Sequence, residues 1–179
     1  MTLLFLDTEW ADIEGSELLS MALLSEDGSK HFYAERMVRP NEITPFVIES
    51  VLPLLEGGAA AMEDAAFTDA LRRFIASIPN PVVLYDYVND GYLLDVALKG
   101  FRCLPSELEE CYPYPRGVEK RLIEDAAISA GIEDLFAKNP EAARRRHHAL
   151  VDASMLRQAW ARVCTDQYWP QTLPLDIKR

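Results

Sequence analysis

The chain has little cysteine, little glycine and no long hydrophobic run. Three cysteines in 179 residues are odd in number and lack C-x-x-C spacing, so neither a disulfide scaffold nor a structural zinc site is expected. Eight glycines and 11 prolines do not fit collagen-like or low-complexity sequences. No apolar run approaches the ~18 residues of a membrane span, and the apolar stretch 3–6 is too short for a signal peptide. We therefore expect no membrane association and, by default, a cytoplasmic protein.

Positive charge is also scarce. Eighteen Lys and Arg stand against 29 Asp and Glu, a net charge of −11. Such a chain repels long polyanions, which argues against a protein that coats or scans duplex nucleic acid. A small nuclease remains compatible with this charge, because bound divalent cations invert its sign locally.

The composition is 49% hydrophobic, and no linker or internal repeat divides the chain. This predicts one domain over 1–179, with a core at about 3–163 and an irregular tail at 165–179. Strands are expected at 3–9, 17–24, 30–35 and 82–85, with a hairpin turn at 26–29. Helices are expected at 45–52, 66–78, 90–99, 118–130 and 148–163, with Gly131 ending the fourth. A fifth strand could lie within 101–117, which has no clear period. The pattern predicts an α/β domain with a mixed sheet.

Two carboxylates end the first predicted strand. Asp7 and Glu9 are two residues apart, so both project from one face of that strand. The strand is apolar on both faces, which predicts a central position in the sheet. Adjacent carboxylates there repel each other unless a cation lies between them. The alternative is that both lie in solvent beyond the strand and bind nothing.

Further acidic residues lie at positions where an apolar residue is expected. Asp152 belongs to the apolar stripe of the last helix, where an unpaired carboxylate would cost several kcal/mol. Its alternative role is a salt bridge or a cap. Asp90 opens a helix in line with the apolar face, where Asp is also a common N-cap. Asp86, at the end of the preceding strand, competes with Asp90 as a candidate site residue.

Basic residues gather before the last helix. His147 and His148 follow Arg144, Arg145 and Arg146. A histidine near carboxylates can act as a general base near neutral pH. Three arginines before a helix oppose its dipole, so phosphate contacts are one explanation and a solvated helix start is the other.

Together these motifs resemble a known family. The segment Leu4-Phe5-Leu6-Asp7-Thr8-Glu9 resembles the first motif of the DEDDh 3′-to-5′ exonucleases, a branch of the ribonuclease H-like superfamily. The segment 147–152, HHALVD, resembles the third motif, H-x4-D, and Asp90 fits the middle motif best. The match runs from Leu3 to Val163, and it is closest to small stand-alone bacterial exoribonucleases, which share the H-x-A-L-V-D-A string.

The resemblance implies a ribonuclease H-like fold, with a mixed five-stranded sheet flanked by helices. It implies that Asp7, Glu9, Asp90 and Asp152 hold two Mg²⁺ or Mn²⁺ ions and that His147 takes the proton from the attacking water. The implied activity is metal-dependent 3′-to-5′ cleavage of short single-stranded RNA, or of DNA, releasing 5′-monophosphate nucleotides. Arg144 to Arg146 would contact substrate phosphates, and a homodimer is compatible with the resemblance.

The chain also departs from the family pattern. The middle motif usually carries Asn four positions before its Asp and an aromatic residue just before it, where this chain has Asp86 and Asn89. Asp86 therefore stays open as the alternative to Asp90. Helical spacing would pair His148 with Asp152, but the family register selects His147 and makes His148 an exposed neighbour. Two other functions remain open: an endonuclease of the same superfamily, and a non-catalytic binding module on this fold.

Overall fold

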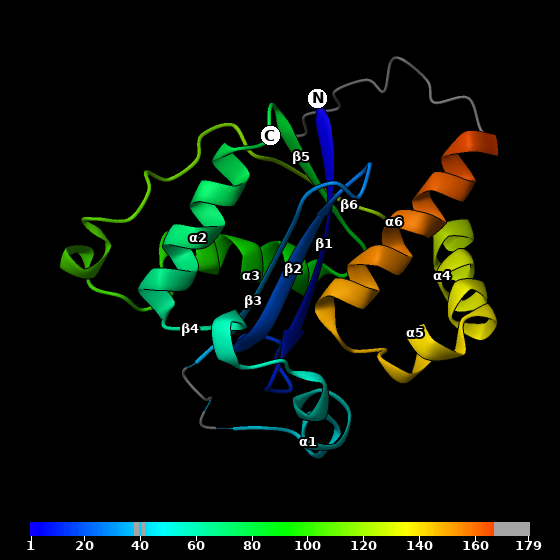
Figure 1. The fold of residues 1–179 in the computed structure, drawn as a ribbon, viewed down its shortest axis with the longest axis horizontal. Helices are drawn as coiled ribbons and strands as arrows, with labels where there is room; N and C mark the ends of the chain where they lie inside the picture. The colour runs from blue at the N-terminus through cyan, green and yellow to red at the C-terminus, as the bar shows by residue number, and fades with distance from the viewer. Residues whose placement is uncertain (38–39, 41, 167–179) are drawn as a thin grey trace.

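A six-stranded mixed sheet forms the centre of the protein (Figure 1). The structure is a computed structural model and describes residues 1–37, 40 and 42–166. The strand order is β4-β3-β2-β1-β5-β6. The strands are β1 (Thr2–Trp10), β2 (Leu18–Ser25), β3 (His31–Arg36), β4 (Ala61–Met62), β5 (Pro81–Tyr85) and β6 (Glu119–Leu122). β1 pairs antiparallel with β2 and parallel with β5, so the chain is an α/β protein.

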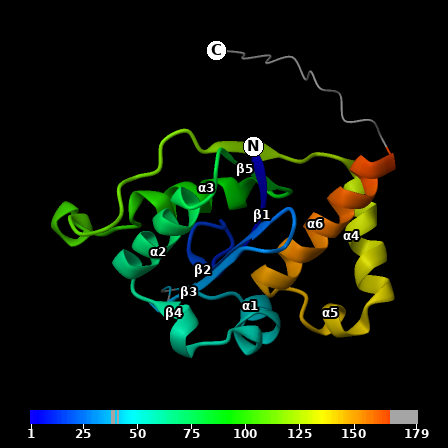
Figure 2. The same cartoon turned by 45° about the horizontal axis from the view of Figure 1, so that its top comes forward.

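Helices cover both faces of this sheet (Figure 2). The α-helices are α1 (Pro45–Ser50), α2 (Asp64–Ala76), α3 (Val88–Lys99), α4 (Ala126–Lys138), α5 (Pro140–Arg144) and α6 (Ala149–Asp166). Short 3-10 turns lie at Leu52–Leu54, Gly58–Ala60 and Pro105–Leu108. Helices α2 and α3 pack on one face and helices α4 and α6 on the other. Among the described residues, no helix is long and apolar enough to cross a membrane.

Strand β1 is central, as its sequence predicts, and its two faces build two cores. Leu4 and Leu6 are fully buried in the cluster under α2 and α3. Phe5 is fully buried in the cluster under α4 and α6. Since side chains alternate along a strand, Asp7 and Glu9 continue the Phe5 face toward α6.

Most predicted elements are confirmed to within about two residues. The turn at 26–29 closes the β2–β3 hairpin with Gly28 at φ +71°, a left-handed conformation that glycine adopts without strain. Thr44 caps α1 by accepting a hydrogen bond from the Val47 amide at 3.3 Å. Helix α1 ends at Ser50, and Pro53 lies in the 3-10 turn Leu52–Leu54 that follows it. Of the predicted irregular tail 165–179, residues 165 and 166 belong instead to α6, and the rest lies outside the described residues.

The predicted helix 118–130 is wrong. Residues 119–122 form β6, which extends the sheet by pairing with β5, so the fifth strand lies just beyond 101–117. Helix α4 begins after Asp125, whose side chain accepts the amides of Ala127 and Ile128. Gly131 lies inside α4 instead of ending it. A Cβ there would come 3.3 Å from that of Ala159, so glycine allows α4 and α6 to pack closely. The two-residue β4, which brings the sheet to six strands, was also not predicted.

Candidate active site

The predicted site residues meet at one edge of the sheet. Parallel strands end at the same edge, so the carboxyl ends of β1 and β5 lie together, and the starts of α3 and α6 lie beside them. A cavity of about 360 Å³ opens there. Its charged lining residues include Asp7, Glu9, Asp12, Asp86, Asp90, Arg146, His147 and Asp152. All five predicted catalytic residues thus line one cavity.

Asp90 is held at the floor of this cavity by β1. Its side chain is 1% exposed, and its Oδ1 accepts hydrogen bonds from the hydroxyl of Thr8 at 2.6 Å and from the Thr8 amide at 3.2 Å. Thr8 lies between the two acidic residues of β1 and points to the opposite face, which carries α3. The Thr in the D-T-E string therefore fixes the third carboxylate, a role that sequence spacing did not reveal.

Burial, and then repulsion from neighbouring carboxylates that include Asp86, raise the pKa values of all four carboxyl groups. Burial, and then repulsion from Asp152 and Asp90, raise the pKa of Glu9 to about 8. Burial raises the pKa of Asp90 to about 7, although the Thr8 hydrogen bonds oppose it. Burial raises the pKa of Asp152 to about 7 against the His147 amide and Arg146. The pKa of Asp7 rises well above its usual value for the same reasons, burial first. Four such groups cannot all be ionised in one cavity without added positive charge.

Three carboxylate oxygens in this cluster are buried without a hydrogen-bond partner in the described part of the chain. They are Oδ2 of Asp7, Oδ2 of Asp90 and Oδ1 of Asp152. Buried polar atoms are almost always paired, so three orphans in one cluster require an explanation. An oxygen-seeking divalent cation such as Mg²⁺ or Mn²⁺ would satisfy them, and carboxylate oxygens are the ligands these ions prefer. The donor set therefore fits such a cation.

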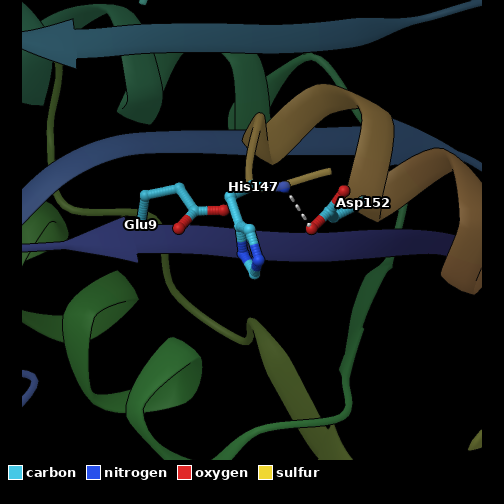
Figure 3. Close-up of side chains that lie close together, drawn as sticks. All are labelled: Glu9, His147 and Asp152. Carbon is cyan, nitrogen blue, oxygen red and sulfur yellow. Dashed lines mark hydrogen bonds between the residues drawn. The ribbon is translucent and has the colours of Figure 1, made fainter. Parts of the chain in front are cut away.

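His147 completes the cluster from the loop before α6 (Figure 3). Glu9, His147 and Asp152 each offer one possible ligand atom, and these three atoms lie within 4.8 Å of one another. The His147 amide donates a hydrogen bond to Oδ2 of Asp152 at 3.1 Å. Burial, and then the charge of Arg146, lower the pKa of the His147 ring. The imidazole is consequently neutral at physiological pH and able to accept a proton.

His148 is not an exposed neighbour, so that expectation is wrong. It is 2% exposed and stacks on Tyr33, with ring centroids 4.7 Å apart and planes 15° apart. The two histidines face different ways because His147 has a left-handed backbone at φ +74°. A regular helix would have kept His148 on the Asp152 face, as its spacing suggested, but α6 begins only at Ala149.

The three arginines have separate environments. The three arginines do not open α6. Arg144 is the last residue of α5, where its positive charge interacts favourably with the helix dipole. Arg145 lies 3.5 Å from Glu56. Arg146 pairs with Glu133 and lies over the ring of Phe136. Of the three, Arg146 lines the cavity and is the one that the structure brings to the predicted site.

Asp86 also lies at the cavity, but in a different manner from Asp90. Asp86 is exposed, whereas Asp90 is buried. The negative charge of Asp86 raises the pKa values of Asp7, Asp90 and Asp152 by repulsion. Asp90 accepts a hydrogen bond from Thr8 of β1 and carries a buried oxygen without a partner among the described residues. These observations favour Asp90 as the middle carboxylate.

Aromatic side chains also line the cavity, among them Trp10, Phe46 and Tyr87. Phe46 of α1 lies edge-on to the His147 ring, with centroids 4.9 Å apart. Trp10 stacks on Tyr87 with centroids 5.4 Å apart. Phe46 and Tyr87 are 53% and 55% exposed, so each offers a free apolar surface beside the carboxylates. Only the tertiary fold brings α1 to this edge of the sheet.

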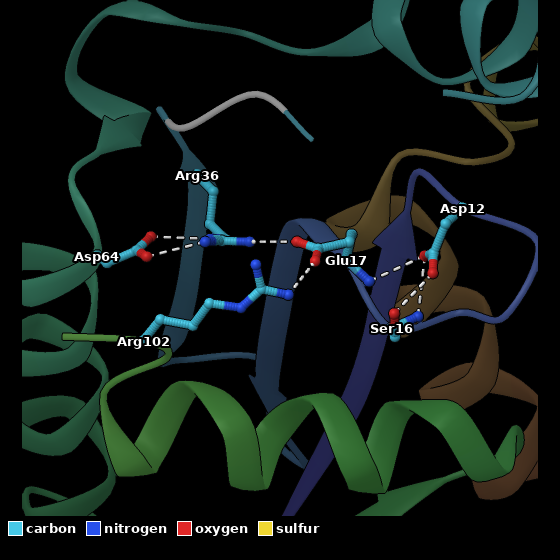
Figure 4. A network of polar contacts seen from close by, with 6 residues as sticks. All are labelled: Asp12, Ser16, Glu17, Arg36, Asp64 and Arg102. Atoms are coloured by element: carbon cyan, nitrogen blue, oxygen red, sulfur yellow. Dashed lines mark hydrogen bonds and ion pairs between the residues drawn. The ribbon is translucent and has the colours of Figure 1, made fainter. Parts of the chain in front are cut away.

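Asp12 of the loop between β1 and β2, residues 11–17, also lines the cavity, and an ion-pair network anchors this loop (Figure 4). Arg36 of β3 binds both carboxylate oxygens of Asp64 at 2.8 Å and Glu17 at 3.4 Å. Arg102 also binds Glu17 at 2.6 Å. The Glu17 amide in turn donates to Asp12, which lines the cavity. The network thus connects the loop to β3 and α2.

Asn89 fixes the tip of the same loop. Its amide nitrogen donates to the carbonyls of Glu14 at 3.2 Å and Gly15 at 3.3 Å. A Cβ on Gly15 would fall 1.7 Å from that nitrogen, and Gly15 has φ +68°. These two hydrogen bonds hold the loop against the start of α3.

No model of a known protein family matches the chain, and no curated protein matches it significantly.

Proposed function

We propose that this chain is a metal-dependent 3′-to-5′ exonuclease of the ribonuclease H-like superfamily. This proposal rests on three buried carboxylate oxygens without a partner among the described residues, each from a residue that lines the same cavity. They come from the first, middle and third motifs of the resemblance, which lie far apart in the sequence. A mixed sheet with helices on both faces is compatible with the proposed fold.

Asp7, Glu9, Asp90 and Asp152 would hold two divalent cations. When bound, two such ions stabilise the attacking and leaving oxygens of an in-line phosphoryl displacement. The protein's own contribution is to hold the four carboxylates in place: Thr8 fixes Asp90, and the His147 amide fixes Asp152. The raised pKa values support the same reading, because a site that repels its own charges gains most from bound cations.

His147 would act as the general base. Its ring lines the cavity, its lowered pKa keeps it neutral, and Phe46 limits its movement on one side. A neutral imidazole beside the scissile phosphate can take the proton from an attacking water. Removing the ring should therefore reduce turnover far more than substrate binding.

The substrate class follows from the cavity walls and the charge of the protein. The overall charge of −11 disfavours long duplexes, whereas exposed Phe46 and Tyr87 suit the unstacked bases of a single strand. We propose short single-stranded RNA or 3′ overhangs as substrate, with DNA as the alternative. RNA is favoured through the resemblance to exoribonucleases. Arg146 is the cavity's cation for phosphate contact.

The test is cleavage of a 5′-labelled RNA 12-mer and its DNA counterpart with Mg²⁺, Mn²⁺ or EDTA. We expect a metal-dependent ladder that shortens from the 3′ end, and its loss in Asp7→Asn and His147→Asn. Asp134→Asn is the matched control, because Asp134 is an ion-paired carboxylate on the outer surface of α4. A circular RNA separates the alternatives: cleavage of the circle would indicate an endonuclease.

Calorimetric titration with Mn²⁺ covers the remaining alternative. We expect binding in the wild type and in Asp134→Asn but not in Asp7→Asn. If the wild type shows neither cleavage nor Mn²⁺ binding, the proposal is contradicted and a non-catalytic binding module is favoured.

A further inference from the structure

His148 is buried beside the proposed base, yet it does not face the cavity. Its ring lies flat on Tyr33 of β3, and its Nε2 is 3.2 Å from Oε1 of Glu56. A carboxylate only accepts hydrogen bonds, so Nε2 carries the ring hydrogen in this contact. Nδ1 is buried and has no partner among the residues described. The ring is therefore fixed by one stacking contact and one polar contact, both from elements distant in sequence.

The backbone between the two histidines links the anchored His148 ring to the position of His147. His147 has φ +74°, which costs a residue with a side chain about 1 kcal/mol or more. The conformation is held on both sides: the His147 amide binds Asp152, and the His148 amide binds the Arg145 carbonyl at 3.0 Å. The His148 carbonyl accepts the amides that open α6. Release of the His148 ring would let this turn relax and move the His147 ring.

A buried glutamate on β3 holds both partners of His148. Glu35 is 3% exposed and accepts a hydrogen bond from the Tyr33 hydroxyl at 2.6 Å. It also accepts the amides of Glu56 at 2.6 Å and Gly57 at 2.9 Å. The segment carrying Glu56 thus has a fixed position against β3, and so does the Tyr33 ring.

The sheet connects this anchor to the carboxylate cluster. Glu35 pairs in register with Ser20 of β2, and Ser20 pairs with Glu9 of β1. Cross-strand partners share a face, so the three side chains form one row across the sheet. Glu9, at one end of the row, belongs to the carboxylate cluster. Glu35, at the other end, belongs to the contacts that anchor His148.

We propose that Tyr33, Glu56 and His148 form a clamp that positions His147 for catalysis. This inference rests on the proposed exonuclease function and adds positioning residues to it. None of the three lines the cavity, so they act through the His147 backbone and not on the substrate. Loosening the clamp should lower kcat and leave KM and Mn²⁺ affinity nearly unchanged.

Glu56→Ala is the informative variant, because the Glu56 side chain is 52% exposed and its removal leaves the core intact. We expect kcat to fall about 10–100-fold, as for other residues that orient a catalytic group, with KM and Mn²⁺ affinity within about twofold. Glu56→Gln should recover most of the lost rate, since an amide oxygen accepts the same hydrogen bond. Glu110→Ala, an exposed glutamate in the 101–117 segment, is the control.

A second measurement needs no activity. The chain has three histidines, so the His147 ring resonance in a proton–carbon NMR spectrum is assigned by its loss in His147→Asn. We expect this resonance to shift or broaden in Glu56→Ala but not in Glu110→Ala. If the wild type cleaves nothing, the proposed function fails, and the resonance alone tests the clamp. Unchanged kcat with an unchanged resonance would overturn it, and so would parallel losses of kcat and Mn²⁺ affinity.

Discussion

Raising the pH of the metal-free protein should destabilise it. The folded-state pKa of Glu9 is about 8, and those of Asp90 and Asp152 are about 7, against usual values of 4.5 and 3.8. Between these values the folded state binds more protons than the unfolded state. Stability is therefore greatest below the unfolded pKa values and falls as the pH rises through 7 and 8.

The size of the loss follows from the same pKa values. One pKa unit corresponds to about 1.4 kcal/mol. Between about pH 6 and pH 8.5, Glu9 loses ~3 kcal/mol of stabilisation, and Asp90 and Asp152 lose ~1 kcal/mol each. In a domain of this size, 1 kcal/mol shifts Tm by about 2–4 °C. The contribution of Glu9 alone corresponds to a fall of about 6–12 °C.

Two histidines change the stability with pH in the opposite direction: they make the folded protein more stable as the pH rises. Burial lowers the pKa values of His147 and His148, so their protonation at low pH destabilises the folded state. The histidine contribution to the pH dependence of stability cancels when the wild type is compared with Glu9→Gln, because both proteins carry the same histidines. The amide cannot ionise, so the variant should lose less Tm than the wild type between the two pH values.

The assay is thermal unfolding in EDTA at both pH values, repeated with excess Mn²⁺. A ligand at 100 times its Kd stabilises a protein by about 2.7 kcal/mol, so Mn²⁺ should restore the wild type at high pH. At low pH it should help less, because protonated carboxyl groups bind metal poorly. The same Tm change in wild type and Glu9→Gln would refute the reasoning: Glu9 would then be ionised in the metal-free fold, and no cation would be needed.

Three further substitutions test the packing around the site. Gly15→Ala clashes with Asn89 at a left-handed position and should lower both Tm and any nuclease activity; an unchanged Tm would contradict this contact. Arg36→Met leaves Asp64 without its bidentate partner and should cost about 3 kcal/mol in urea unfolding, so a loss below about 0.5 kcal/mol would count against a structural network. Gly131→Leu overpacks the α4–α6 contact and should cost about 1–3 kcal/mol in the same assay, whereas stabilisation would show that the two helices leave room for a larger side chain there.

Much of the candidate site could be predicted from local pattern, because the relevant geometry is itself local. Two residues on a strand share a face whatever surrounds them, which places Asp7 beside Glu9. Helical spacing places Asp152 on the stripe that faces the sheet. Partners of the individual side chains could not be predicted in this way. The Thr8–Asp90 bond joins residues 82 positions apart, and nothing in either segment specifies it.

The sequence by itself determined the strands of the β1–β3 meander and most helices, since these depend on neighbours two to four positions away; the convergence of the five candidate residues was an expectation from the family resemblance. The tertiary structure decided what depends on distant contacts. Residues 119–122 are a strand because β5 offers an open edge, and Gly131 continues a helix because Ala159 lies against it. His148 is buried because Tyr33 and Glu56 enclose it. Such pairings are chosen by chain topology and packing, which no local period encodes.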